Sequence, residues 1–95
     1  MEENKRGGWV LADTIQPGNL PEKVATAWSE LMQNIAGAKY VPVLYVGTQL
    51  VNGTNHMILS RQDLSVLNGE SHLVKVILNC ALTGEWSILS IETII

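Results

Sequence analysis

The sequence predicts an α+β protein in which one long helix packs on a four- to five-stranded antiparallel sheet. Five apolar residues recur with the helical period of about 3.6 residues: Val24, Ala27, Trp28, Leu31 and Ile35. From Tyr40 onward the composition changes to β-branched and aromatic residues, and no later segment keeps a helical apolar period. One amphipathic helix ahead of a meander of strands can bury its apolar stripe against one face of that sheet.

The leader and the helix come first along the chain. Charged residues followed by Gly7-Gly8 predict a mobile leader over residues 1–8, and the segment 9–11 can form a short first strand. Asn19, with Glu22 three residues later, matches a helix capping box. We therefore expect a helix over residues 20–36, and Gly37 is placed to close it in a left-handed conformation.

Four strands are expected after the helix, over residues 40–51, 54–61, 71–82 and 86–94. Asn52-Gly53 between two strand-like runs is the strongest short-range signal of an antiparallel hairpin, and that turn type needs a positive φ at both residues. Asn68-Gly69 indicates a further turn, and the segment 82–85 indicates the final hairpin.

The 95 residues can build one core, so we expect a single domain over residues 1–95, with residues 1–8 as a flexible trunk. The net charge of −3, with acidic and basic residues interspersed, favours neither nucleic acid nor a membrane as partner. The single Cys80 cannot form an internal disulfide, and the first residues lack a secretory signal. A cytoplasmic location is expected.

Residues that could carry chemistry are few and scattered. Cys80 lies within an apolar run, which predicts packing in the core, and His56 and His72 are expected on strand surfaces. No metal-ligand spacing, nucleophile elbow or glycine-rich phosphate loop occurs. We therefore expect no enzymatic activity, no metal and no cofactor.

The segment Gln49-Leu50-Val51-Asn52-Gly53 matches the QxVxG pattern of cystatins, and the segment 48–58 closely resembles the first hairpin of stefins. The trunk glycines, the helix and the antiparallel strands also occur in the cystatin order. The resemblance implies a cystatin-like fold and a reversible, tight-binding inhibitor of papain-like cysteine proteases of the cathepsin type. Such an inhibitor inserts its N-terminal trunk and two hairpin loops into the active-site cleft.

Carried over position by position, the resemblance assigns protease binding to the trunk glycines, the first hairpin and the second hairpin. These residues are Gly7, Gly8, Gln49, Leu50, Val51, Asn52, Gly53, Thr83, Gly84, Glu85 and Trp86. Trp86 would be an aromatic anchor at the interface. The chain differs from the family pattern in having Lys5-Arg6 ahead of the trunk glycines, and in keeping Trp86 without a preceding proline.

A second hypothesis is a non-inhibitory interaction module of the same fold. It would self-associate or bind a protein partner through its sheet, as a homodimer or a domain-swapped dimer. The run from Trp86 to Ile91 and the end Thr93-Ile94-Ile95 are apolar enough to support such contacts.

Overall fold

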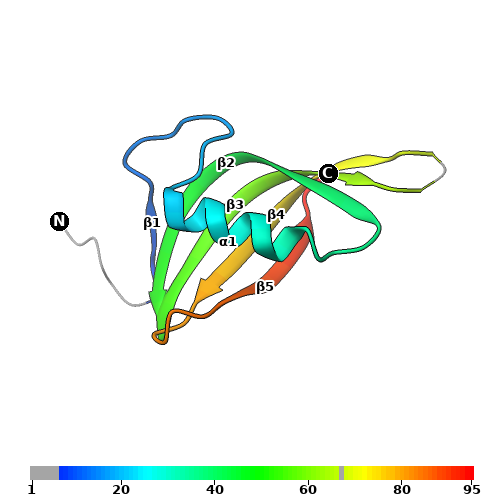
Figure 1. Ribbon diagram of the computed structural model, residues 1–95. Helices are drawn as coiled ribbons and strands as arrows, with labels where there is room; N and C mark the ends of the chain where they lie inside the picture. Colours follow the sequence, from blue (N-terminus) through cyan, green and yellow to red (C-terminus); the bar gives the residue numbers. More distant parts are fainter. Residues whose placement is uncertain (1–6, 67) are drawn as a thin grey trace.

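In the part of the chain that the structure describes, one helix and five strands form the architecture (Figure 1). The computed structural model describes residues 7–66 and 68–95. Its elements are β1 (Trp9–Leu11), α1 (Glu22–Met32), β2 (Ala38–Val51), β3 (Gly53–Leu64), β4 (Ser71–Cys80) and β5 (Trp86–Thr93). All neighbouring strands pair antiparallel, in the order β1-β2-β3-β4-β5. The α+β class and the antiparallel sheet are therefore confirmed.

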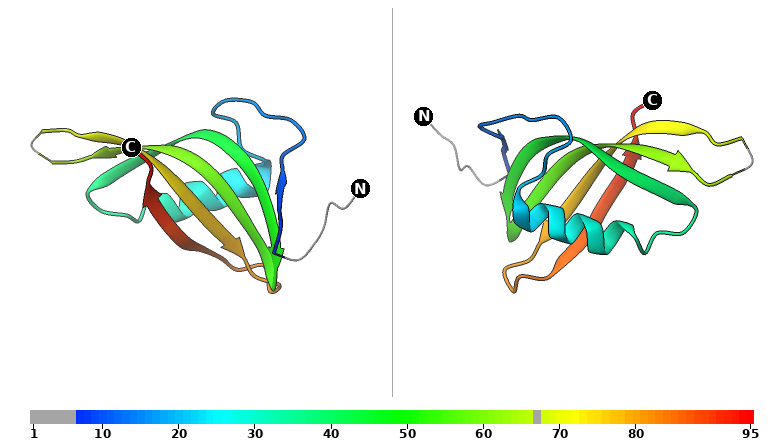
Figure 2. Two further views of the ribbon diagram at one scale, coloured as in Figure 1. Left: turned by 180° about the vertical axis from the view of Figure 1, so that it is seen from behind. Right: turned by 45° about the horizontal axis from the view of Figure 1, so that its top comes forward.

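The core lies between α1 and the concave face of the sheet, which bends around the helix (Figure 2). Val24, Trp28 and Met32 of α1 are buried against four sheet residues that are fully inaccessible to solvent: Ile58, Val74, Val76 and Leu78. The register of β2 against β3 shifts twice, between Pro42 and Leu44 and between Tyr45 and Gly47. Extra residues of this kind bend and twist a strand, which lets the long β2 follow the curve of the sheet.

The start of α1 differs from the prediction. The helix begins at Glu22, and Pro21 occupies the N-cap position without any side-chain cap. Asn19 instead donates its side-chain amide to Oε1 of Gln16 over 2.6 Å. The predicted capping box of Asn19 and Glu22 is wrong, because Asn19 lies two residues ahead of the cap.

The end of α1 is also earlier than predicted, at Met32 rather than near residue 36. The Asn34 side chain donates to the carbonyl of Glu30 over 3.0 Å, a local bond that competes with continuation of the helix. Gly37 has the predicted left-handed φ of +86°, but it leads into β2 instead of closing α1. Ile35 still packs against the core, so its place in the apolar pattern is kept.

The molecule is elongated, with extents of 48 × 26 × 21 Å. The loop between β3 and β4 projects from one end, whereas the β2–β3 and β4–β5 connections lie together at the opposite end (Figure 1). Gly7, just ahead of β1, also lies at the second of these ends, beside Leu50 of β2. Residues 1–6 of the predicted trunk lie outside the described residues.

Candidate functional site

Three segments that are distant in sequence meet at one end of the sheet. We call this surface the narrow end and define it as Gly7–Gly8, Gln49–Gly53 and Ala81–Glu85. The amide of Gly7 donates to the carbonyl of Leu50 over 3.0 Å, which ties this glycine to the first hairpin. A Cβ placed on Gly53 would lie 2.5 Å from the carbonyl oxygen of Cys80, so the first hairpin packs directly on the base of the second.

The first hairpin ends in a very tight turn. Val51 pairs with Gly53, which leaves only the exposed Asn52 at the tip. Gly53 has a φ of +109°, and no described residue other than glycine has a positive φ. The predicted hairpin is confirmed, but the predicted turn with positive φ at both Asn52 and Gly53 is wrong. The chain reverses its direction through Asn52 alone, and Gly53 is the one residue of the turn with a left-handed φ.

The second hairpin closes through two backbone hydrogen bonds. The amide of Ala81 donates to the carbonyl of Glu85 over 2.9 Å, and the amide of Gly84 donates to the carbonyl of Ala81 over 2.8 Å. Thr83, Gly84 and Glu85 are exposed. The hairpin predicted for residues 82–85 is confirmed.

Apolar side chains are exposed at both hairpins of the narrow end. Leu50 is 43% exposed on the first hairpin, and Leu82 is 79% exposed on the second. Glu85 is the only charged residue within the narrow end. Depletion of charge around exposed apolar groups is typical of the centre of a protein–protein interface. Sequence reasoning missed Leu82; a leucine inside a turn otherwise made of Thr83 and Gly84 was the available signal.

Trp86 follows the second hairpin and faces the helix side of the sheet. It is partly buried, packs against the core, and its ring centroid lies 5.0 Å from that of His56. Nδ1 of His56 lies 2.8 Å from the Tyr45 hydroxyl. Burial lowers the pKa of His56 and raises the pKa of Tyr45. The prediction that His56 is a surface residue is wrong, whereas the role of Trp86 as an interface anchor stays a prediction.

On the opposite face of the sheet, three amide side chains form a chain of hydrogen bonds that ends at the trunk. Asn79 donates to Asn55 over 2.9 Å, and Asn55 donates to Gln49 over 3.0 Å. Gln49 in turn donates to the carbonyl of Gly7 over 3.0 Å. Sequence reasoning assigned no role to Asn55 or Asn79, because only the strand register brings them beside Gln49.

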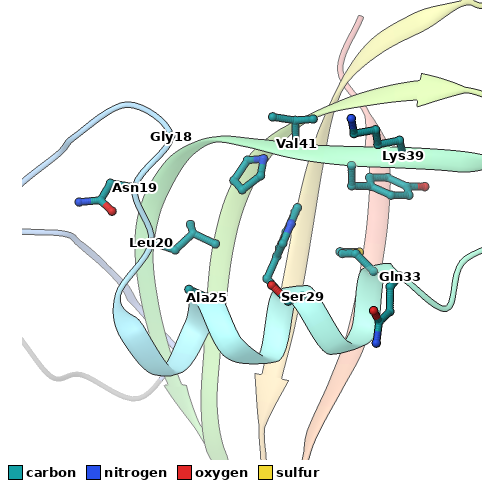
Figure 3. A pocket seen from close by; sticks show the side chains of 12 residues that line it. Gly18, Asn19, Leu20, Ala25, Ser29, Gln33, Lys39 and Val41 are labelled. Atoms are coloured by element: carbon teal, nitrogen blue, oxygen red, sulfur yellow. The ribbon is translucent and has the colours of Figure 1, made fainter.

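A groove of about 590 Å³ runs between α1 and β2, away from the narrow end (Figure 3). Core side chains such as Trp28, Met32 and Tyr40 line it, and the polar Gln33 and Lys39 stand beside them. Nothing in this lining pairs a nucleophile with a base. The groove is where the helix leaves part of β2 uncovered.

Within residues 7–66 and 68–95, no group of three His, Cys, Asp or Glu side chains is arranged to hold a metal ion. Cys80 is only partly buried, at the end of β4, and its thiol lies 3.8 Å from the Ala81 carbonyl oxygen. The helix in this part of the chain is too short to cross a membrane. Comparisons with protein-family models, curated protein sequences and solved structures gave no match to this chain.

Proposed function

We propose that this protein is a stefin-like cystatin that reversibly inhibits papain-like cysteine proteases of the cathepsin type. The observation that supports the proposal is the convergence of the three implied segments at the narrow end. Gly7 lies within hydrogen-bond distance of Leu50, and Gly53 lies against the carbonyl of Cys80 at the base of the second hairpin. The segments that the sequence resemblance pairs with a protease cleft thus form one continuous surface.

The chemical character of that surface fits a partner cleft. Leu50 and Leu82 offer apolar contact on two separate hairpins, and Glu85 adds the single charge. Backbone hydrogen bonds hold the loops in place before any partner arrives, so little ordering entropy is lost on binding. The proposed action is binding alone, with no chemical step performed by this protein.

Resistance to cleavage is part of the proposal. A protease cleaves an extended segment, whereas the reversal around Asn52 is confined to one residue between the paired Val51 and Gly53. Because Cys80 is the sole cysteine, the fold needs no oxidising compartment, and we propose a protease of the cytoplasm or of compartments in contact with it as the target.

Titration of papain with the wild-type protein tests the proposal. We expect the wild-type protein to inhibit papain at micromolar concentration or below. The double variant Leu50→Asp/Leu82→Asp should bind papain at least about 100-fold more weakly, because both apolar anchors become charged. Leu89→Asp is the matched control, since Leu89 is 58% exposed on β5, outside the narrow end. Absence of inhibition by the wild type at micromolar concentration would contradict the proposal.

A second candidate function is self-association through the sheet. β5 is an edge strand, and it exposes Leu89, while Ile94 and Ile95 beyond it are also exposed. Unpaired strand edges with apolar side chains can pair with another chain. Light scattering over a range of concentrations distinguishes the candidates: a dimer that Leu89→Asp dissociates supports self-association, and a monomer throughout rules it out.

A further inference from the structure

The hydrogen-bonded amides of Asn79, Asn55 and Gln49 connect β4 to the trunk across two intervening strands. We propose that Asn55 and Asn79 are positioning residues that hold Gly7, at the base of the trunk, in place for partner binding, acting through Gln49. The functional part of this inference rests on the proposed function, because the trunk matters only if the narrow end binds a protease. The structural part, which concerns the position of Gly7, can be tested without a protease.

The orientation of all three amide side chains follows from the last acceptor of the hydrogen-bonded series, the carbonyl of Gly7. The carbonyl of Gly7 can only accept a hydrogen bond, so Gln49 must direct its NH₂ group toward it. The oxygen of Gln49 then faces Asn55, which must donate, and the oxygen of Asn55 faces Asn79, which must donate in turn. All three bonds run in one direction, from β4 to the trunk, and bonds arranged in this way strengthen one another.

Burial prevents the hydrogen bonds of this series from reversing at low cost. Asn55 is only 6% exposed, so water has little access to replace a lost bond at the middle of the chain. If Asn79 or Asn55 could no longer donate, the amides between it and the trunk would have to reverse. The oxygen of Gln49 would then face the oxygen of Gly7, which repels the trunk instead of holding it.

Two near-isosteric substitutions create this reversal. Asn55→Asp and Asn79→Asp keep the shape of the side chain, but an ionised carboxylate accepts hydrogen bonds and cannot donate them. Asn79 makes no contact with Gly7 in the hydrogen-bond chain, so an effect of its substitution on Gly7 has to pass through Asn55 and Gln49. Gln62→Glu on β3 is the matched control, because the Tyr40 hydroxyl that now accepts from Gln62 can donate to a carboxylate.

Amide hydrogen exchange followed by NMR provides the first test. We expect the Gly7 amide to exchange roughly 10-fold faster in Asn55→Asp and in Asn79→Asp, the scale set by one lost hydrogen-bonded contact. Its rate should be unchanged in Gln62→Glu. The amide of Val76 in the core serves as an internal reference that reports loss of global stability. Unchanged Gly7 exchange relative to Val76 in either Asp variant that folds would overturn the inference.

A pH profile separates positioning from a general structural effect. A protonated carboxyl at position 55 regains a donor, so Gly7 protection in Asn55→Asp should return toward the wild-type value measured at the same acidic pH. The flanking Gln49 and Asn79 do not titrate, and His56 lies on the other face against Tyr45 and Trp86. If the Gly7 amide of Asn55→Asp stays poorly protected at acidic pH, the proposed role of the three amides in holding Gly7 is contradicted.

Inhibition of papain tests the functional part. In the wild type, deletion of residues 1–7 should weaken inhibition, whereas in Asn79→Asp the same deletion should have an effect at least about 5-fold smaller, because the trunk is already released. An undiminished effect of the deletion would contradict the positioning role. Failure of the wild type to inhibit would contradict the proposed function and the trunk's role in binding, and the exchange experiment would still decide whether the amides hold Gly7.

Discussion

The hydroxyl of Tyr45 lies 2.8 Å from Nδ1 of His56, on the helix side of the sheet. The ring of Trp86 also lies close to the imidazole, with 5.0 Å between the ring centroids. Burial lowers the pKa of His56 from its ordinary value of 6.5. The neutral imidazole is therefore the favoured form in the folded protein, and Nδ1 can accept the hydrogen bond that Tyr45 donates.

The first prediction concerns the stability of the fold in acid. The lowered pKa means that the unfolded chain binds a proton at position 56 more readily than the folded one. The contribution of His56 to stability is present above pH 6.5 and is lost as the pH falls through the lowered folded-state pKa. Thermal unfolding should thus depend less steeply on acidic pH in His56→Gln than in the wild type. His72→Gln is the control, and equal slopes in wild type and His56→Gln would contradict the prediction.

The second prediction concerns the attachment of β1. A Cβ on Gly47 would lie 2.1 Å from the carbonyl oxygen of Val10, so Gly47→Ala must push β1 away from β2. Overpacking of this kind costs about 1–3 kcal/mol in the free energy of unfolding. Hydrogen exchange should become faster at Ala12, whose amide donates to the Val46 carbonyl, and stay slow at Ala81 in the second hairpin. An unchanged Ala12 amide would show that β1 tolerates the methyl group.

The third prediction concerns the core. Ile58 on β3 has no exposed surface and packs between the helix and the sheet. Ile58→Ala should lower the free energy of unfolding by about 2–5 kcal/mol, because it removes buried carbon and leaves a cavity. Leu89→Ala, at an exposed position, should change it by no more than about 0.5 kcal/mol. Urea unfolding measures both values, and similar losses for the two variants would contradict this account of the core.

The fourth prediction concerns the contact between the two hairpins. Gly53→Ala places a methyl group against the Cys80 carbonyl and at a φ of +109°. Gly84→Ala introduces only the strain of a left-handed φ, about 1–2 kcal/mol in the free energy of unfolding, because a Cβ there meets no atom within 4 Å. Gly53→Ala should therefore cost more stability than Gly84→Ala. Papain inhibition should weaken at least about 10-fold in Gly53→Ala, since one hairpin shifts relative to the other. Equal stability of the two alanine variants would argue against the close contact.

The parts of the fold that the sequence predicted are those with local causes. The apolar period of the helix depends on residues three and four apart, and the hairpin depends on a glycine that can adopt a positive φ. The capping box failed for an equally local reason, because Pro21 took the cap position from which a side chain would have acted. Strand pairing in a meander then followed from chain order.

The environment of the strand residues could not be predicted in the same way. Both faces of β3 carry apolar residues, with Ile58 on one and Met57 and Leu59 on the other, so alternation alone does not say which face the helix covers. The sequence pattern therefore predicts a surface position for His56, whereas in the structure it shares the helix side with Ile58. Of the candidate site, the first hairpin and the loop positions were predictable. The pairing of Asn55 with Asn79 was not, because it depends on a strand register that joins residues 24 positions apart in the sequence.

The elongated shape separates two regions that can be altered independently. The loop over residues 65–70 projects from the end of the molecule opposite the narrow end (Figure 1), and its described residues on either side of residue 67, Val66 and Asn68, are exposed. Surface loops that carry no core packing accept insertions well. A fluorescent label, an affinity peptide or a whole fused protein placed there would leave Leu50 and Leu82 unobstructed, which makes this loop the natural handle for immobilising the protein in binding assays.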